Sequence, residues 1–93
     1  MTMLRLSKHA ARRRQQRGIP PLIIEWLQRY GARVHSFGAC IRFFNKRSRR
    51  ALATAVGEAV VQRLAPYLNS YAVVGQDGTV VTVGHRFRRV RVP

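Results

Sequence analysis

The sequence is poor in acidic residues. Only three of its 93 residues are Asp or Glu, against 18 Lys or Arg, and the formal net charge is +15 at pH 7. Glu25, Glu58 and Asp77 are too few and too scattered to supply the converging carboxylates of a two-metal nuclease site. A field this positive attracts polyanions strongly and makes copies of the chain repel one another. The composition therefore predicts a polyanionic partner.

Cysteine, long apolar runs and glycine-rich phosphate loops are also scarce or missing. A lone Cys40 excludes an internal disulfide and a cysteine zinc cluster, and no metal site is expected. No apolar run approaches the roughly 20 residues of a membrane-spanning helix. The start, MTMLRLSKHAARRR, becomes basic too soon for a signal peptide, which favours a cytoplasmic protein. Without a phosphate-binding glycine loop, no cofactor is expected.

What the sequence does contain is a hydrophobic fraction of 46%, which indicates a folded core in one basic domain, 1–93. Ser7 as N-cap and Gly18 as terminator predict a helix over 8–17. A second helix should open at Pro20-Pro21 and end at Gly31. Its predicted buried stripe is Leu22, Ile23, Trp26, Leu27 and Tyr30.

The second half of the chain predicts an antiparallel sheet. Residues 32–45 fit two short strands around Gly38, or one strand with a bulge there. Residues 46–66 fit a helix that Gly57 can split, and residues 71–92 fit a hairpin with an Asp77-Gly78 turn. A change in apolar parity predicts an irregularity near Arg88-Arg89. The expected order is α-α-β-β-α-β-β, an α+β fold with an antiparallel sheet packed against helices.

The most unusual segment is SKHAARRRQQRGI, residues 7–19. On a helix, His9, Arg13 and Arg17 form one stripe. Like charges four residues apart destabilise an isolated helix by a few tenths of a kcal/mol, and the nearest carboxylate is Glu25. One interpretation is a surface that binds an anion, and the other is the solvated side of an ordinary helix.

This segment resembles the helix signature His-Ala-x-x-Arg-x-x-x-Arg-Gly-Ile of a family of small bacterial domains, grouped with the RelE/BrnT-like toxins. His9, Ala10, Arg13, Arg17, Gly18 and Ile19 match it position by position, and DGTVVTVGHR is similar to the family's last hairpin. Arg14 departs from it, because the family often has Met there. The resemblance implies a curved RelE/BrnT-like sheet and ribonuclease activity, with His85 and Arg86 on its concave face.

Metal-independent RNA cleavage needs a general base, a general acid and cations that stabilise the phosphorane. His9 and His85 are candidates for base and acid, if they meet in space. Tyr71, or Tyr67, is a candidate for proton transfer or base stacking. Arg86 completes the candidate catalytic set. The predicted nucleic-acid contacts are Arg12, Arg13, Arg17, Arg42, Lys46 and Arg88.

Three functions remain open from the sequence. The first is an endoribonuclease toxin that acts on mRNA, free or ribosome-bound, and is held by an acidic antitoxin protein. The second is a non-catalytic module that binds RNA or DNA. The third is an accessory protein whose basic face docks an acidic partner. The first two functions share a polyanionic ligand, and RNA is the favoured one.

Overall fold

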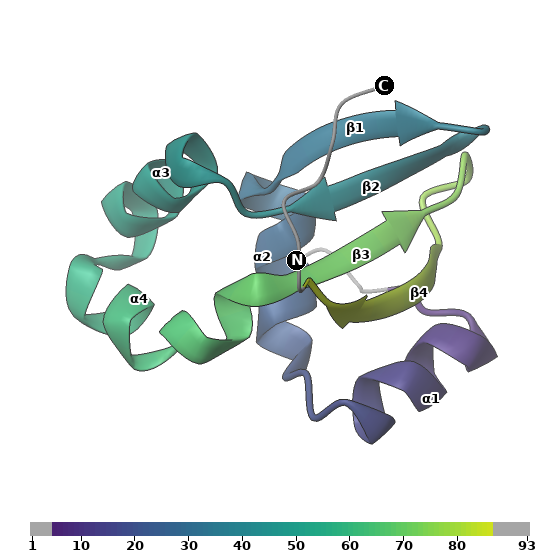
Figure 1. The fold of residues 1–93 in the computed structure, drawn as a ribbon, viewed down its shortest axis with the longest axis horizontal. Coiled ribbons are helices and arrows are strands. Elements are labelled where there is room, and N and C mark those ends of the chain that lie inside the picture. Colours follow the sequence, from purple (N-terminus) through teal and green to yellow (C-terminus); the bar gives the residue numbers. More distant parts are fainter. Residues whose placement is uncertain (1–4, 87–93) are drawn as a thin grey trace.

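The computed structural model describes residues 5–86, which form an α+β fold with one four-stranded antiparallel sheet (Figure 1). Its strand order is β1-β2-β3-β4. The elements are, in chain order, α1 (Lys8–Gln16), α2 (Pro21–Tyr30), β1 (Ala32–Ser36), β2 (Ala39–Phe43), α3 (Lys46–Val56), α4 (Glu58–Arg63), the 3-10 helix η1 (Ala65–Asn69), β3 (Ser70–Val74) and β4 (Val80–His85). The predicted fold class is confirmed. The order follows the prediction, with the third helix divided into α3 and α4.

The helices lie on one face and at two ends of the sheet. Helix α2 covers the back of the sheet, α1 runs beside β4, and α3 and α4 lie at the opposite end (Figure 1). Strand register sends Ala72 and Val83 towards α2, where they join Ile23, Leu27 and Phe44 in the core. Among residues 5–86 no helix covers the other face of the sheet, which we call the helix-free face (Figure 1).

Helix α1 is fixed to the start of β4 by Ser7. The Ser7 side chain accepts a hydrogen bond from the Ala10 amide and donates one to the Val81 carbonyl, while the Ser7 amide donates to Val80. This satisfies one of the amides left open at a helix start. Gly18 follows the helix at φ 62°, in the left-handed region that favours glycine. Both predicted ends of this helix are confirmed, within one residue.

The predicted stripe of α2 is wrong at one position. Leu22 is 43% exposed, whereas Ile24 is fully buried. The helix packs against the sheet through Ile23, Ile24 and Leu27, so the buried face is centred one position further along than the sequence pattern indicated. Trp26 is buried in the core as expected.

The β3–β4 hairpin contains the Asp77-Gly78 turn that the sequence predicts, followed by a bulge. Val73 pairs with Thr82, but Val74 pairs with Val80, so Val81 is an extra residue in β4. The bulge turns Val80 into the core and leaves Val81 exposed. The irregularity expected near Arg88-Arg89 lies outside the described residues. Within residues 5–86, no helix has both the length and the apolar character to cross a membrane.

Candidate nucleic-acid interface

Helix α1 presents most of its cationic side chains to solvent. It packs on β4 through the buried Ala10, and Lys8, Arg12 and Arg17 are exposed, while Arg13 is half-buried. Among residues 5–86, none of these four side chains has a hydrogen bond or ion pair. We call these four cations of α1 and its C-cap the α1 surface: Lys8 and Arg12 on one side of the helix, and Arg13 and the C-cap Arg17 on the other. The three arginines predicted to contact nucleic acid are thus available on one helix.

Arg14, which departs from the family signature, is used inside the protein. Its Nη1 donates to the Ile19 carbonyl at 3.2 Å. Ile19 is buried in the core directly after the α1 terminator. Arg14 therefore ties the end of α1 to the segment that leads into α2, and we assign it a structural role.

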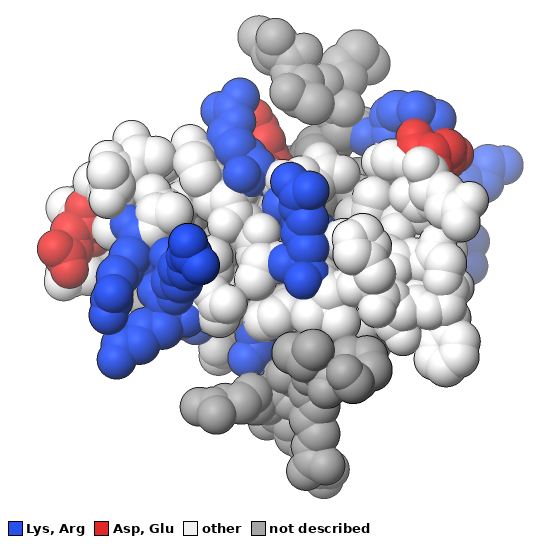
Figure 2. Space-filling view, turned by 90° about the horizontal axis from the view of Figure 1, so that it is seen from above, with Lys and Arg blue, Asp and Glu red and all other residues white. Residues whose placement is uncertain are grey.

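A second group of cations lies on α3. Lys46, Arg47 and Arg50 are exposed, and in the described part of the chain their side chains have no polar partner. We call them the α3 surface. Arg49 differs, because it donates to the Leu68 carbonyl at 3.4 Å and to Asn69 Oδ1 at 3.5 Å. Figure 2 shows Lys and Arg side chains gathered at the end of the molecule where α3 lies.

The sequence predicted only Lys46 of this surface. Asn45 begins α3 with a capping box, in which its side chain accepts from the Ser48 amide at 2.8 Å and Ser48 Oγ accepts from the Asn45 amide at 2.8 Å. Because the helix begins before Arg47, Arg47 and Arg50, which are three residues apart in sequence, are neighbours on its surface. A hollow of about 340 Å³ beside them is lined by Tyr30, Ala32, Asn45, Arg47, Ser48 and Ala51. The Asn-x-x-Ser spacing was the available signal.

Arg42 does not fit the predicted role of a phosphate contact. It is only 8% exposed, and its Nη2 donates to the carbonyls of Gln28 at 2.6 Å and Gly31 at 3.1 Å. These carbonyls lie at the end of α2, where helical partners run out. Burial first, and then the charge of Arg33, lower the pKa of Arg42. The side chain holds α2 onto β2 and is not available to a ligand at the surface.

The two candidate catalytic histidines are not neighbours. His85 Nε2 lies 2.9 Å from the Arg17 carbonyl, at the end of α1. Since a carbonyl only accepts, Nε2 carries the proton of this hydrogen bond. His9 is in the first turn of α1, eight residues before Arg17, which corresponds to about 12 Å of helix. The structure therefore does not assemble the His9–His85 acid–base pair.

Tyr71 and Arg86, by contrast, both lie on the helix-free face. Phe43, Tyr71 and Gly84 are consecutive register partners across β2, β3 and β4. Arg86 reaches back across this row: its guanidinium carbon lies 5.0 Å from the centre of the Phe43 ring, and Nη1 donates to the Phe44 carbonyl at 2.9 Å. An aromatic pair with a stacked arginine is thereby held on the sheet.

Gly84 makes room for the Tyr71 ring. A Cβ at this position would lie 2.9 Å from Tyr71 Oη and Cε1, closer than side-chain atoms approach one another without moving. The tyrosine ring therefore lies over the backbone of β4, beside the residue that precedes His85 and Arg86. The resemblance implied His85 and Arg86 on one face, but register and hydrogen bonding place His85 on the α1 side instead.

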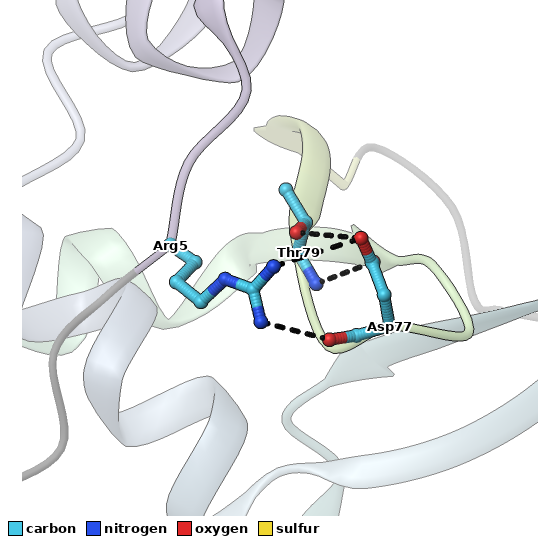
Figure 3. A network of polar contacts seen from close by, with 3 residues as sticks. All are labelled: Arg5, Asp77 and Thr79. Carbon is cyan, nitrogen blue, oxygen red and sulfur yellow. Dashed lines mark hydrogen bonds and ion pairs between the residues drawn. The ribbon is translucent and has the colours of Figure 1, made fainter.

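The carboxylate of Asp77, in the turn between β3 and β4, accepts hydrogen bonds within that turn. Asp77 Oδ1 accepts from the Thr79 amide at 3.0 Å, and Oδ2 accepts from Thr79 Oγ1 at 3.1 Å (Figure 3). Arg5 adds an ion pair at 3.7 Å, the sole one among residues 5–86. Chiefly the Thr79 backbone hydrogen bond, then its side chain, lowers the pKa of Asp77. The carboxylate thus neutralises Arg5 and none of the α1 or α3 cations.

Metal ligands do not gather in the part of the chain described. Residues 5–86 contain no group of three or more His, Cys, Asp or Glu side chains placed to hold a metal ion. The predicted contact Arg88 lies beyond these residues. Comparison with protein-family models, with curated proteins and with solved structures finds no match for this chain.

Proposed function

We propose that this protein binds nucleic acid through its basic surfaces and that its ligand is RNA. The observation that carries the proposal is the clustering of partnerless cations of residues 5–86 on α1 and α3: Lys8, Arg12, Arg13, Arg17, Lys46, Arg47 and Arg50. The other three, Arg29, Arg33 and Arg63, are exposed singly on other elements. Arginine predominates, and its planar fork bonds a phosphate with two parallel hydrogen bonds. With three acidic residues in the chain, the compensating negative charge must come from outside.

The helix-free face favours RNA over duplex DNA. Sequence-tolerant binding of single strands uses aromatic rings on which bases stack, flanked by cations that contact the backbone. Tyr71, which is half-buried, supplies a ring on β3. Arg86 supplies a cation, which the buried Phe43 ring of the adjacent strand supports from below. A DNA duplex has no unstacked bases to offer to such a row. In this proposal the protein acts in the cytoplasm on single-stranded RNA.

Fluorescence anisotropy with labelled RNA tests the proposal. We expect single-stranded RNA to bind more tightly than duplex DNA of the same length near physiological salt. Replacing Arg12 and Arg17 together by Ala should weaken RNA binding more than replacing Arg29 and Arg63, which are exposed on α2 and α4. Both pairs remove the same charge. Absence of RNA binding, or equal effects of the two pairs, contradicts the proposal.

Endoribonuclease activity of the RelE/BrnT-like kind is a second candidate, favoured by the placement of Tyr71 and Arg86 on one face of the sheet. The arginine would stabilise the phosphorane, and the tyrosine would stack on a base or move a proton. In this candidate an acidic antitoxin protein covers the basic surface. Induced expression should then arrest growth and create new RNA 5′ ends, and both effects should disappear in Arg86→Ala and Tyr71→Phe. Growth and RNA unchanged by the wild-type protein would eliminate it.

A further inference from the structure

We propose that the α1 and α3 surfaces bind two separate RNA strands, so that one protein molecule brings the strands together and accelerates their pairing. The inference rests on the proposed RNA binding and adds an activity to it. Strand pairing requires no cleavage chemistry. It requires two anion-binding surfaces on one rigid body, far enough apart for each to hold its own strand.

The fold separates the two surfaces. Helix α1 packs along β4, at one edge of the sheet. Its N-cap residue, Ser7, is hydrogen-bonded to that strand. Helix α3 begins after β2 and packs against α2 and α4. The two helices lie at opposite ends of the molecule, with the sheet and α2 between them (Figure 1). The described body measures 33 × 29 × 28 Å, so a short oligomer on one surface leaves the other open.

Each helix carries its own uncompensated repulsion. In α1, Lys8 lies four residues before Arg12, and Arg13 lies four residues before the C-cap residue Arg17. In α3, Lys46 lies four residues before Arg50. Such like-charge pairs destabilise a helix by a few tenths of a kcal/mol each. Neither helix has an acidic residue in its first turn. This charge repulsion acts within each helix. An anion bound to α1 therefore does not reduce the repulsion between the cations of α3.

The internal contacts of other arginines strengthen this division. Arg14, Arg42 and Arg49 use their guanidinium groups on backbone carbonyls. Ten cations of residues 5–86 have no hydrogen-bond or ion-pair partner there. Seven of them lie on α1 with its C-cap Arg17 and on α3, and the other three, Arg29, Arg33 and Arg63, lie singly on α2, β1 and α4. A polyanion bound at each helix would have part of its charge neutralised, and two RNA strands held by one molecule would repel each other less. That is the physical requirement for accelerated pairing.

Stoichiometry and pairing can be measured on the same protein. Native mass spectrometry would count non-complementary RNA oligomers of about six nucleotides, within the usual site size of small single-strand binders. Energy transfer between two labelled complementary strands would give the pairing rate. For the wild type we expect two oligomers per chain and pairing accelerated by about tenfold or more, a typical gain from electrostatic concentration of reactants.

Two triple variants each remove one surface: Lys8→Ala, Arg12→Ala and Arg17→Ala on α1, and Lys46→Ala, Arg47→Ala and Arg50→Ala on α3. Alanine favours helix and removes like charges, so both variants should fold, as circular dichroism would verify. Each should bind one oligomer and pair strands at the protein-free rate. The matched control replaces Arg29, Arg33 and Arg63, which are exposed elsewhere, and should keep two oligomers and the acceleration.

The outcomes separate this inference from the proposed function. A wild type that binds no RNA overturns both. A wild type that binds RNA at one oligomer per chain, with no acceleration of pairing, leaves RNA binding intact and overturns the two-surface inference. Loss of all binding in either triple variant also overturns it, because the surfaces would then act as one.

Discussion

At the scale of one residue, Arg42 is a buried arginine that stabilises the fold by donating hydrogen bonds to backbone carbonyls. Replacing it by Ala would leave the Gln28 and Gly31 carbonyls at the end of α2 without their donor. We expect Arg42→Ala to lower the free energy of unfolding by about 2–4 kcal/mol, since charged hydrogen bonds and their loss at buried sites are of this size. Urea denaturation measures the change.

RNA affinity supplies the control for Arg42. The folded fraction of Arg42→Ala should bind RNA as the wild type does, whereas Arg50→Ala should keep its stability and bind more weakly. If Arg42→Ala were as stable as the wild type and bound RNA less well, Arg42 would be a surface contact after all.

Gly84 allows a test of the Tyr71 ring that leaves Tyr71 itself unchanged. The Cβ of Gly84→Ala would meet the far end of the tyrosine side chain, which can rotate away at small cost. We expect a change in unfolding free energy of less than about 1 kcal/mol, because no core side chain is removed. RNA affinity should fall to the level of Tyr71→Ala. Anisotropy on the two variants would check this, and wild-type affinity in Gly84→Ala would remove Tyr71 from the interface.

These residues mark the limit of what sequence can predict about single positions. Ser7, Gly18 and the Asp77-Gly78 turn were predictable because caps and turns depend on a few neighbouring residues. The burial of Arg42 and the Tyr71–Gly84 contact depend on which strand lies beside which. Gln28 and Arg42 are fourteen residues apart and meet only after α2 has packed on the sheet. Nothing in the local pattern distinguishes Arg42 from an exposed strand arginine.

At the scale of elements, Gly57 divides α3 from α4. It has φ 92° and ψ 146°, a conformation nearly restricted to glycine. A substituted Cβ would meet no atom within 4 Å, so the cost of Gly57→Ala is backbone strain alone. We expect a loss of about 1–3 kcal/mol in unfolding free energy, measured by urea denaturation. An unchanged midpoint would indicate that α3 and α4 can merge into one helix.

The turn between β3 and β4 should make stability depend on acidity. Thr79 and, more weakly, Arg5 hold the pKa of Asp77 below its ordinary value of 3.8. A carboxyl with a depressed pKa in the folded state stabilises the protein above its unfolded pKa, and this is lost as pH falls through the folded pKa. The wild type should therefore lose stability more steeply than Asp77→Asn below about pH 4.

Denaturation at several pH values compares the two proteins. Asparagine keeps a side-chain oxygen for the Thr79 amide and suits the same turn, so the two should differ in slope more than in fold. Glu25 and Glu58 are present in both proteins and cancel in the comparison. Parallel pH profiles would show that the charge of Asp77 contributes nothing to the hairpin.

Elements were more predictable than their faces. The α-helices and strands were expected from periodicity and glycine placement, with the division at Gly57 and the two strands around Gly38 each given as one of two possibilities, whereas the 3-10 helix η1 was not expected. The faces depended on packing: Ile24 replaced Leu22 in the core, and the bulge at Val81 allows both Val80 and Val83 to point inward. A one-residue insertion inverts every following side chain. Sequence alternation alone does not reveal which residue is the insertion.

At the scale of the whole molecule, the sequence predicted a polyanion but not how the charge is distributed. The count of 18 cations does not show that five arginines of residues 5–86 donate to backbone carbonyls. Nor does it show that seven of the ten cations without a partner there cluster on α1 and α3. The α1 surface was visible as a run of arginines in one helix. The start of α3 at residue 46 was predicted from the sequence, but only the fold shows that Arg47 and Arg50 are exposed while Arg49 is used internally.

The salt dependence of RNA binding should report this distribution directly. For single strands, log K falls with log salt at a slope of about 0.7 per phosphate neutralised. A long RNA that engages both surfaces should lose a slope of about 2 in either triple variant, because three charges are removed. A short oligomer occupies one surface, so its slope should stay nearly constant while the number bound per chain falls from two to one. Titrations across a salt series, with the variant lacking Arg29, Arg33 and Arg63 as the equal-charge control, make the comparison. If short and long RNA lose slope alike, the cations act as one continuous surface, and net charge alone determines binding.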